Sequence, residues 1–194
     1  MRKNKVFIAC DTTNIKKVKK IIKETKNNKL IVGYKFGLEF LNSKNGRQYI
    51  SKLKNKIIFG DYKISDIPNT CASTIRSIKD LKFNYITIHI NSGFEALRIA
   101  KKVAGRTKLI GVTILTSLDN KAIKEIGFSK NIKELVLHQA KLATKAKLDA
   151  IVCSAQEAKI VKRVFKKEII APGIRFSSRK NDQKRTLTPK QAYR

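Results

Sequence analysis

The stretch KIIFGDYK, residues 56–63, contains a short apolar run and ends with the charged residues Asp61 and Lys63 on either side of Tyr62. Runs of this length with β-branched side chains are typical of strands in a parallel sheet that is buried on both faces. Similar runs recur at fairly regular intervals at residues 5–11, 30–37, 85–90, 108–115, 148–154 and 168–174. The sequence therefore predicts seven parallel strands.

The segments between these runs are rich in lysine and carry apolar residues at helical spacing, such as Ile15, Val18 and Ile22 in the first segment. Strands that alternate with helices form right-handed βαβ units, which build either an open doubly wound sheet or a barrel. No glycine-rich nucleotide-binding motif follows the first run, and this favours the barrel. We expect residues 1–194 to form one (β/α)8 TIM-type barrel domain. Because only about seven βα units are found, we expect this domain to be incomplete at its C-terminus.

The composition is strongly basic, with 44 Lys and Arg against 14 Asp and Glu and a formal net charge of +30. The basic residues are spread over nearly every expected helix, and only 7% of the chain is aromatic, which disfavours a nucleic-acid site. No run approaches the ~20 apolar residues of a membrane-spanning helix. The three cysteines are widely spaced, which favours a reducing compartment. We expect a cytoplasmic protein with no nucleic-acid or membrane partner, and its charge suits a small anionic substrate.

Charged residues stand at the ends of the apolar runs, where barrels of this kind carry their catalytic groups. Asp61 and Lys63 end the run at 56–63, and a strand period of two places them on one face. With Asp66 and with Lys35 from the neighbouring run, they would form an alternating Lys-Asp-Lys-Asp array. At ~4 Å and an effective dielectric near 20, each attraction is worth about 4 kcal/mol, which would keep Lys63 protonated as a proton donor. The alternative is an ordinary surface salt bridge.

Residues 61–70, DYKISDIPNT, resemble the signature Asp-x-Lys-x-x-Asp-Ile-Pro-Asn-Thr of orotidine 5'-phosphate decarboxylases, particularly those of bacteria. Further matches to this family follow in register at residues 9–11 (ACD), 35–39 (KFGLE), 112–117 (VTILTS), 152–157 (VCSAQE), 172–175 (PGIR) and 182–185 (DQKR). The resemblance implies a carboxy-lyase that converts orotidine 5'-monophosphate (OMP) to UMP and CO2 in de novo pyrimidine biosynthesis. It also implies that no metal or organic cofactor is needed.

The same resemblance assigns roles to the charged residues. Lys63 would deliver a proton to C6 of the pyrimidine, and Asp61 would stand against the departing carboxylate. Lys35 and Asp66 would complete the array. The family also implies a homodimer with shared active sites, in which the segment that carries Asp66 reaches into the partner's pocket.

Binding roles follow from the resemblance as well. The residues implied to bind the substrate are Asp11, Thr70, Ser117, Arg175 and Gln183. The first two would contact the ribose hydroxyls, and Ser117 would bind the pyrimidine. The last two belong to residues 175–188, a segment without periodicity that would form a lid and reach the phosphate.

The chain departs from the family pattern at two places. HINSG, residues 89–93, replaces the commoner His-Ala-Ser-Gly-Gly, and we expect His89 to be structural rather than catalytic. The family's eighth strand ends in a Gly-Arg pair that holds the substrate phosphate, and no such strand precedes Arg194. An inactive fragment is therefore one alternative interpretation.

Three further alternatives remain open. A related barrel enzyme decarboxylates 3-keto-L-gulonate 6-phosphate with a similar Asp-x-Lys-x-x-Asp motif and Mg²⁺, although the Asp-Ile-Pro-Asn-Thr continuation favours the orotidine enzyme. An aldolase-type barrel would use Lys63 as a Schiff-base nucleophile, which requires a depressed pKa. A nucleic-acid-binding protein would be retained on DNA or RNA in a salt-sensitive manner.

Overall fold

A computed structural model describes residues 5–26, 29–175 and 185–192. Its strands form one parallel sheet in chain order. They are β1 (Lys5–Ala9), β2 (Ile31–Phe36), β3 (Ile57–Ile64), β4 (Tyr85–His89), β5 (Lys108–Val112), β6 (Ala150–Val152) and β7 (Glu168–Ile170). The seven predicted strands are therefore confirmed, although β1, β5, β6 and β7 end two to four residues earlier than the apolar runs suggested.

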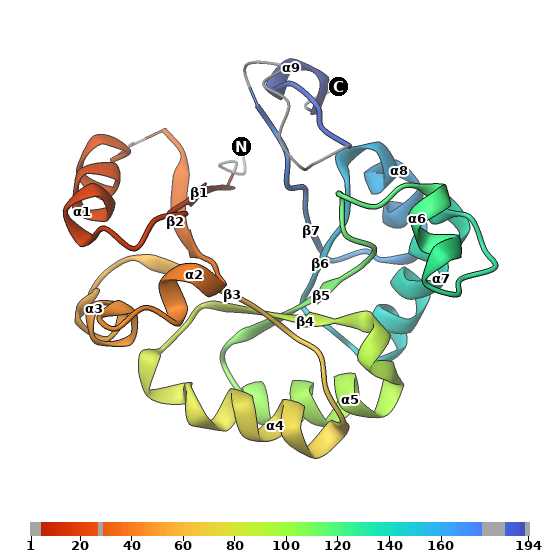
Figure 1. Cartoon of the computed structure of the whole chain (residues 1–194), viewed down its shortest axis with the longest axis horizontal. Coiled ribbons are helices and arrows are strands. Elements are labelled where there is room, and N and C mark those ends of the chain that lie inside the picture. Colours follow the sequence, from red (N-terminus) through yellow and green to blue (C-terminus); the bar gives the residue numbers. More distant parts are fainter. Residues whose placement is uncertain (1–4, 27–28, 176–184, 193–194) are drawn as a thin grey trace.

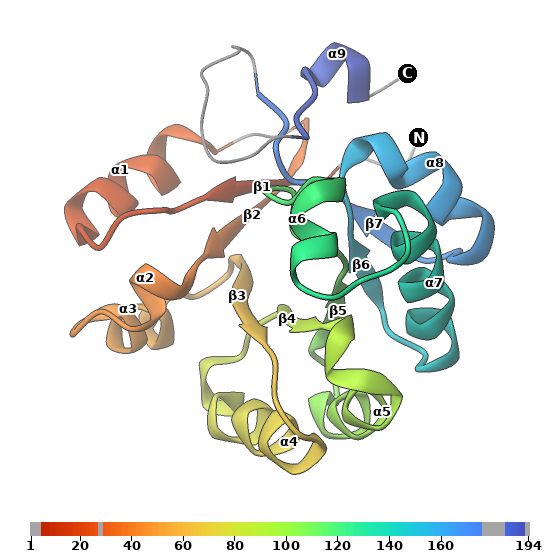
Figure 2. The same ribbon diagram turned by 45° about the vertical axis from the view of Figure 1, so that its right-hand side comes forward.

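The sheet curls around the centre of the molecule, and the helices lie on its outer side (Figures 1 and 2). The sequence prediction of alternating strands and helices in a barrel is confirmed. The helices are α1 (Ile15–Glu24), α2 (Leu38–Leu41), α3 (Gly46–Lys52), α4 (Pro68–Ser77), α5 (Gly93–Ala104), α6 (Asn120–Glu125), α7 (Ile132–Lys145), α8 (Ala155–Val164) and α9 (Pro189–Ala192). Two short 3-10 helices are η1 (Lys79–Leu81) and η2 (Ile90–Ser92).

Local chemistry fixes where several helices begin. Asn14, Asp119 and Asn131 each accept a hydrogen bond from a backbone N–H in the first turn of the helix that follows. Ser154 does the same for α8, so its role at the end of β6 is that of a cap. Helix α4 begins at Pro68, because a proline fits the first helical position and keeps the residue before it extended.

The apolar core has two layers, as a curled sheet requires. The larger layer lies between the sheet and the helices and contains most of the buried Ile, Leu and Phe side chains. The smaller layer lies inside the curl and is formed by Phe59, Tyr85, Ile110 and Ala150. Phe7 packs against this inner cluster, with its ring centre 5.2 Å from those of Phe59 and Tyr85.

A polar network closes the inside of the curl at the N-terminal ends of the strands. Glu168 begins β7 and accepts hydrogen bonds from Lys5 (2.8 Å), which begins β1, and from Lys108 (3.1 Å). The Tyr85 hydroxyl also donates to Glu168, at 3.1 Å. Although burial opposes ionisation of the Glu168 carboxyl, its two lysine partners hold its pKa below the ordinary value. Side chains thus link the first and last strands of the sheet.

Candidate active site

The centre of the site lies at the end of β3, where the strand bulges. Gly60 pairs with Ile86 of β4, whereas Ile64 pairs with Ile88, so β3 contains two more residues than β4 over the same length. Within this bulge Lys63 has φ 48°, in the left-handed region that non-glycine residues rarely adopt. Bulges next to active sites commonly re-aim a side chain. Sequence periodicity assumed a regular strand here and missed the bulge.

Asp61 lies within the bulge and connects the charged side chains. Its Oδ2 is 2.7 Å from Nζ of Lys63 and 3.4 Å from Nζ of Lys35. Its Oδ1 accepts a hydrogen bond from the Thr87 hydroxyl at 3.0 Å. Lys35 also lies 3.4 Å from Asp11, which follows β1. Within one chain the structure therefore contains a continuous array in the order Asp11, Lys35, Asp61, Lys63.

The array sets the ionisation of Asp61 and affects that of the nearby His89. Burial alone would raise the pKa of Asp61, which is only 8% exposed, but the ammonium groups of Lys63 and Lys35 hold that pKa below its ordinary value of 3.8. Asp61 is therefore a carboxylate at neutral pH. Burial and the neighbouring Lys63 lower the pKa of His89 below 6.5, so its imidazole is uncharged at neutral pH.

Asp66 and Thr70 do not join the array within this chain. Asp66 is exposed, and its carboxylate accepts a hydrogen bond from the backbone N–H of Ile67 at 2.7 Å. Thr70 is exposed in the first turn of α4. Ile67 is 67% exposed, the largest exposed fraction among the large apolar side chains of the described residues. The predicted pairing of Asp66 with Lys63 is thus not made inside one subunit.

The remaining predicted residues follow β5 and β7. Ser117 is half-buried in the segment between β5 and α6. Arg175 follows β7, and its backbone N–H donates to the carbonyl of Leu187 at 3.1 Å. Gln183 lies outside the described residues. Their roles in substrate binding stay predictions.

A buried ion pair that sequence reasoning missed contacts the segment after β5, which also carries Ser117. Arg185 and Glu157 are 2.6 Å apart, and their side chains are only 11% and 9% exposed. Arg185 also donates to the carbonyls of Ile114 and Leu115, at 3.2 and 3.1 Å. Both residues belong to stretches that carried the family resemblance, but spacing alone gave no sign that they pair.

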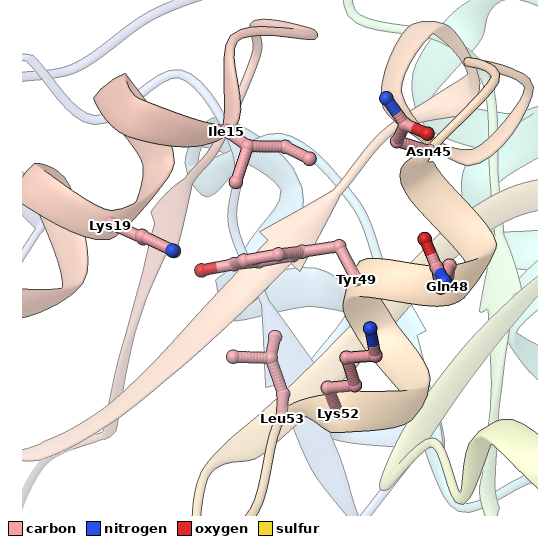
Figure 3. A pocket seen from close by; sticks show the side chains of 7 residues that line it. All are labelled: Ile15, Lys19, Asn45, Gln48, Tyr49, Lys52 and Leu53. Atoms are coloured by element: carbon pink, nitrogen blue, oxygen red, sulfur yellow. The ribbon is translucent and has the colours of Figure 1, made fainter.

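A cavity of about 580 Å³ lies on the outer side of the sheet between α1 and α3 (Figure 3). Tyr49 extends across it with its hydroxyl directed toward Lys19 (Figure 3). Its lining residues are Ile15, Lys19, Asn45, Gln48, Tyr49, Lys52 and Leu53. None of these belongs to the charged array, so the cavity is separate from the candidate site.

The described part of the chain shows neither a metal-binding cluster nor a membrane-spanning helix. Across residues 5–26, 29–175 and 185–192, His, Cys, Asp and Glu side chains do not gather in groups of three or more that could hold a metal ion. In the same part of the chain, none of the helices has the length and apolar character needed to cross a membrane.

Comparison with known proteins decides which family the fold and this site represent. Residues 4–194 match the model of the orotidine 5'-phosphate decarboxylase / HUMPS family, which covers almost the whole chain. The chain belongs to this family. The resemblance inferred from residues 61–70 is thereby confirmed.

Individual members of the orotidine 5'-phosphate decarboxylase family agree with this assignment. The orotidine 5'-phosphate decarboxylase of Wolbachia pipientis subsp. Culex pipiens (strain wPip) is 43% identical over 164 residues, which cover 81% of this chain and 72% of that protein. The enzyme of the same name from Wolbachia sp. subsp. Brugia malayi (strain TRS) is 40% identical, over 97% of this chain and 85% of that protein.

A solved structure confirms the barrel fold. The crystal structure of orotidine 5'-phosphate decarboxylase from Lactobacillus acidophilus superposes with a TM-score of 0.79 and 30% sequence identity. The alignment covers 89% of this chain and 82% of that one.

Proposed function

We propose that this chain is an orotidine 5'-monophosphate decarboxylase, which converts OMP to UMP and CO2 in de novo pyrimidine biosynthesis. The observation that carries the proposal is the contact of 2.7 Å between Lys63 and the buried carboxylate of Asp61 at the end of β3. The family match over residues 4–194 and relatives that bear this enzyme's name support the choice of substrate.

In the proposed reaction, Lys63 supplies the proton. The bond between C6 and the carboxylate breaks, the electron pair stays on C6, and CO2 leaves. The Lys63 ammonium stabilises the negative charge that develops at C6 and then transfers a proton to it. The resulting amine regains a proton from solvent. No cofactor takes part in these steps.

Asp61 and Lys35 prepare Lys63 for this role. The carboxylate of Asp61 lies 2.7 Å from the Lys63 ammonium and would hold it in position beside C6. Lys35, 3.4 Å from the same oxygen, helps to keep Asp61 ionised. Because Asp61 stands against the departing carboxylate, it would also favour loss of CO2.

The remaining residues are proposed to bind the nucleotide. Asp11 and Thr70 would hold the ribose hydroxyls, Ser117 the pyrimidine, and Arg175 and Gln183 the phosphate. Asp11 supports this arrangement, because its carboxylate is mostly exposed and yet contacts Lys35 of the array. Binding of the remote phosphate would help to organise the charged site around the reacting ring.

We also propose a homodimer with shared active sites. Asp66 and Thr70 are exposed in the segment that follows β3, and Ile67 between them exposes 67% of its surface. Contact with a second subunit would remove this apolar side chain from water, which is favourable. Asp66 would then complete the array of the partner subunit.

Purified protein incubated with OMP tests the proposed activity. Chromatography should show UMP formed in equal amounts with and without EDTA. If UMP does not form, but the protein releases CO2 from 3-keto-L-gulonate 6-phosphate in a reaction that EDTA abolishes, the magnesium-dependent alternative holds instead.

A further inference from the structure

We infer that Thr87 of β4 is a positioning residue for the proposed decarboxylation, because its single hydroxyl holds both the carboxylate of Asp61 and the backbone of Lys63. The inference rests on the proposed function for its effect on turnover. Its geometric basis is independent of the substrate.

The two hydrogen-bond partners of the Thr87 hydroxyl fix its orientation. Thr87 is fully buried, and its Oγ1 accepts a hydrogen bond from the Lys63 backbone N–H at 2.8 Å. Because an N–H can only donate, the hydroxyl proton is free to be donated to Oδ1 of Asp61, 3.0 Å away. One side chain thus connects the two residues proposed to act on C6.

This connection fixes the carboxylate of Asp61. The two oxygens of Asp61 have different partners, with Thr87 at Oδ1 and the ammonium groups of Lys63 and Lys35 at Oδ2. Holding Oδ1 sets the plane of the carboxylate, and this places Oδ2 between the two ammonium groups. Without the hydroxyl, the carboxylate would be free to rotate away from them.

The same hydroxyl also holds the backbone of the bulge. Lys63 has φ 48°, a conformation that a lysine keeps only where surrounding contacts impose it. The regular ladder between β3 and β4 shifts register between Gly60 and Ile64, so it does not hold Lys63 in place. The hydrogen bond from its N–H to Thr87 supplies a contact of the required kind.

Thr87 acts through its neighbours and not on the substrate, because none of its surface is exposed. Thr113, which follows β5, provides a matched comparison. It is 2% exposed, and its hydroxyl donates to the carbonyl of Val152 at 2.8 Å. Replacing either threonine by valine removes a buried hydroxyl at nearly constant volume, but only the change at Thr87 touches Asp61 and Lys63.

The test compares Thr87→Val, Thr87→Ser and Thr113→Val with the wild type. We expect Thr87→Val to lower kcat by about 10²-fold, as small displacements of reacting groups do, with KM close to the wild-type value. Thr87→Ser keeps the hydroxyl and should retain most of the activity, as should Thr113→Val. The acid limb of the kcat profile should move to higher pH in Thr87→Val, because the Thr87 hydrogen bond helps to lower the pKa of Asp61.

A measurement without substrate separates this inference from the proposed function. NMR titration of the Asp61 carboxyl carbon should show a higher pKa in Thr87→Val than in the wild type and Thr113→Val. If the wild type does not decarboxylate OMP, the proposed function is wrong, and the titration still tests Thr87. If Thr87→Val does not fold, Thr87→Cys should instead show a higher Asp61 pKa than the wild type, because a thiol is a weaker hydrogen-bond donor than a hydroxyl. An unchanged pKa with wild-type kcat in the folded variant would overturn the inference.

Discussion

Asp61 is the residue on which the charged array depends, because both lysines contact its Oδ2. Its pKa in the folded protein lies below the ordinary value of 3.8, as the lysines outweigh the effect of burial. A carboxyl of this kind adds stability above its unfolded pKa, and that stability is lost as the pH falls through the folded pKa.

Asp61→Asn should therefore lower the free energy of unfolding at neutral pH, by about 2 kcal/mol, because charged hydrogen bonds are lost while Lys63 stays partly solvated. Urea unfolding of both proteins over a pH series checks this expectation. The difference between them should shrink below pH 3.8, the ordinary pKa of the group. A difference that is constant with pH would show that the charge of Asp61 is not its cause.

Lys63 should also discriminate between nucleotides by the charge at C6. A uridine monophosphate analogue with an anionic group at C6 mimics the carbanion-like state, so we expect it to bind at least about 10²-fold more tightly than UMP. Isothermal titration calorimetry measures both affinities. In Lys63→Ala the preference should largely disappear, and equal affinities in the wild type would argue against a site built around Lys63.

Among the individual residues of the site, the sequence predicted most of the array, because charged residues at the ends of apolar strands are conspicuous. Asp11, Lys35, Asp61 and Lys63 do lie together. Thr87 was not found, because a threonine inside a strand is unremarkable and its importance comes from contacts across to β3. The left-handed conformation of Lys63 has no compositional signal either.

The elements themselves were predictable from the apolar runs, but their ends were not. β5, β6 and β7 stop at Val112, Val152 and Ile170, where the predicted runs continued for up to four residues. The reason is that backbone pairing ends before the apolar pattern does. Residues beyond the ladder then form the loops that carry Ser117 and Arg175.

The buried pair between Glu157 of α8 and Arg185 links the segment that follows β6 to the segment that follows β7. Arg185 also binds the carbonyls of Ile114 and Leu115, next to the loop that carries Ser117. We expect Glu157→Ala to lower the free energy of unfolding by about 3–5 kcal/mol, because it leaves a buried guanidinium without its counter-ion.

Glu95→Ala is the matched control for this prediction. Glu95 and Arg98 also form a close pair, but both side chains are about half exposed on α5. Water screens the attraction in such exposed pairs, so denaturant unfolding should show a much smaller loss. Equal losses in the two variants would mean that burial of the Glu157 pair has no special effect.

For the molecule as a whole, the seven runs predicted the barrel topology, but not how the curl is closed at its N-terminal end. Lys5, Tyr85, Lys108 and Glu168 each begin a strand, and they meet only because the sheet curls. Partners separated by 163 residues, such as Lys5 and Glu168, leave no local pattern in the sequence.

A further prediction concerns the assembly of two subunits into a dimer with shared active sites. If Asp66 completes the partner's array, a mixture of inactive Lys63→Ala and inactive Asp66→Ala proteins should regain activity. With random exchange, half of the dimers are hybrids and one of the two sites in each is intact, so activity should reach about a quarter of the wild-type value. Turnover after demonstrated subunit exchange is the measurement. A mixture that exchanges subunits and stays inactive would show that each site uses its own Asp66.

Turnover of OMP by Lys63→Ala tests most directly whether Lys63 is the proton donor. Loss of the proposed proton donor should lower kcat/KM by at least about 10³-fold, while the variant still unfolds cooperatively. Lys54→Ala, at an exposed lysine that precedes the same strand, is the control and should keep wild-type turnover. If folded Lys63→Ala decarboxylates OMP at a rate close to that of the wild type, Lys63 is not the proton donor, and the proposed mechanism is wrong.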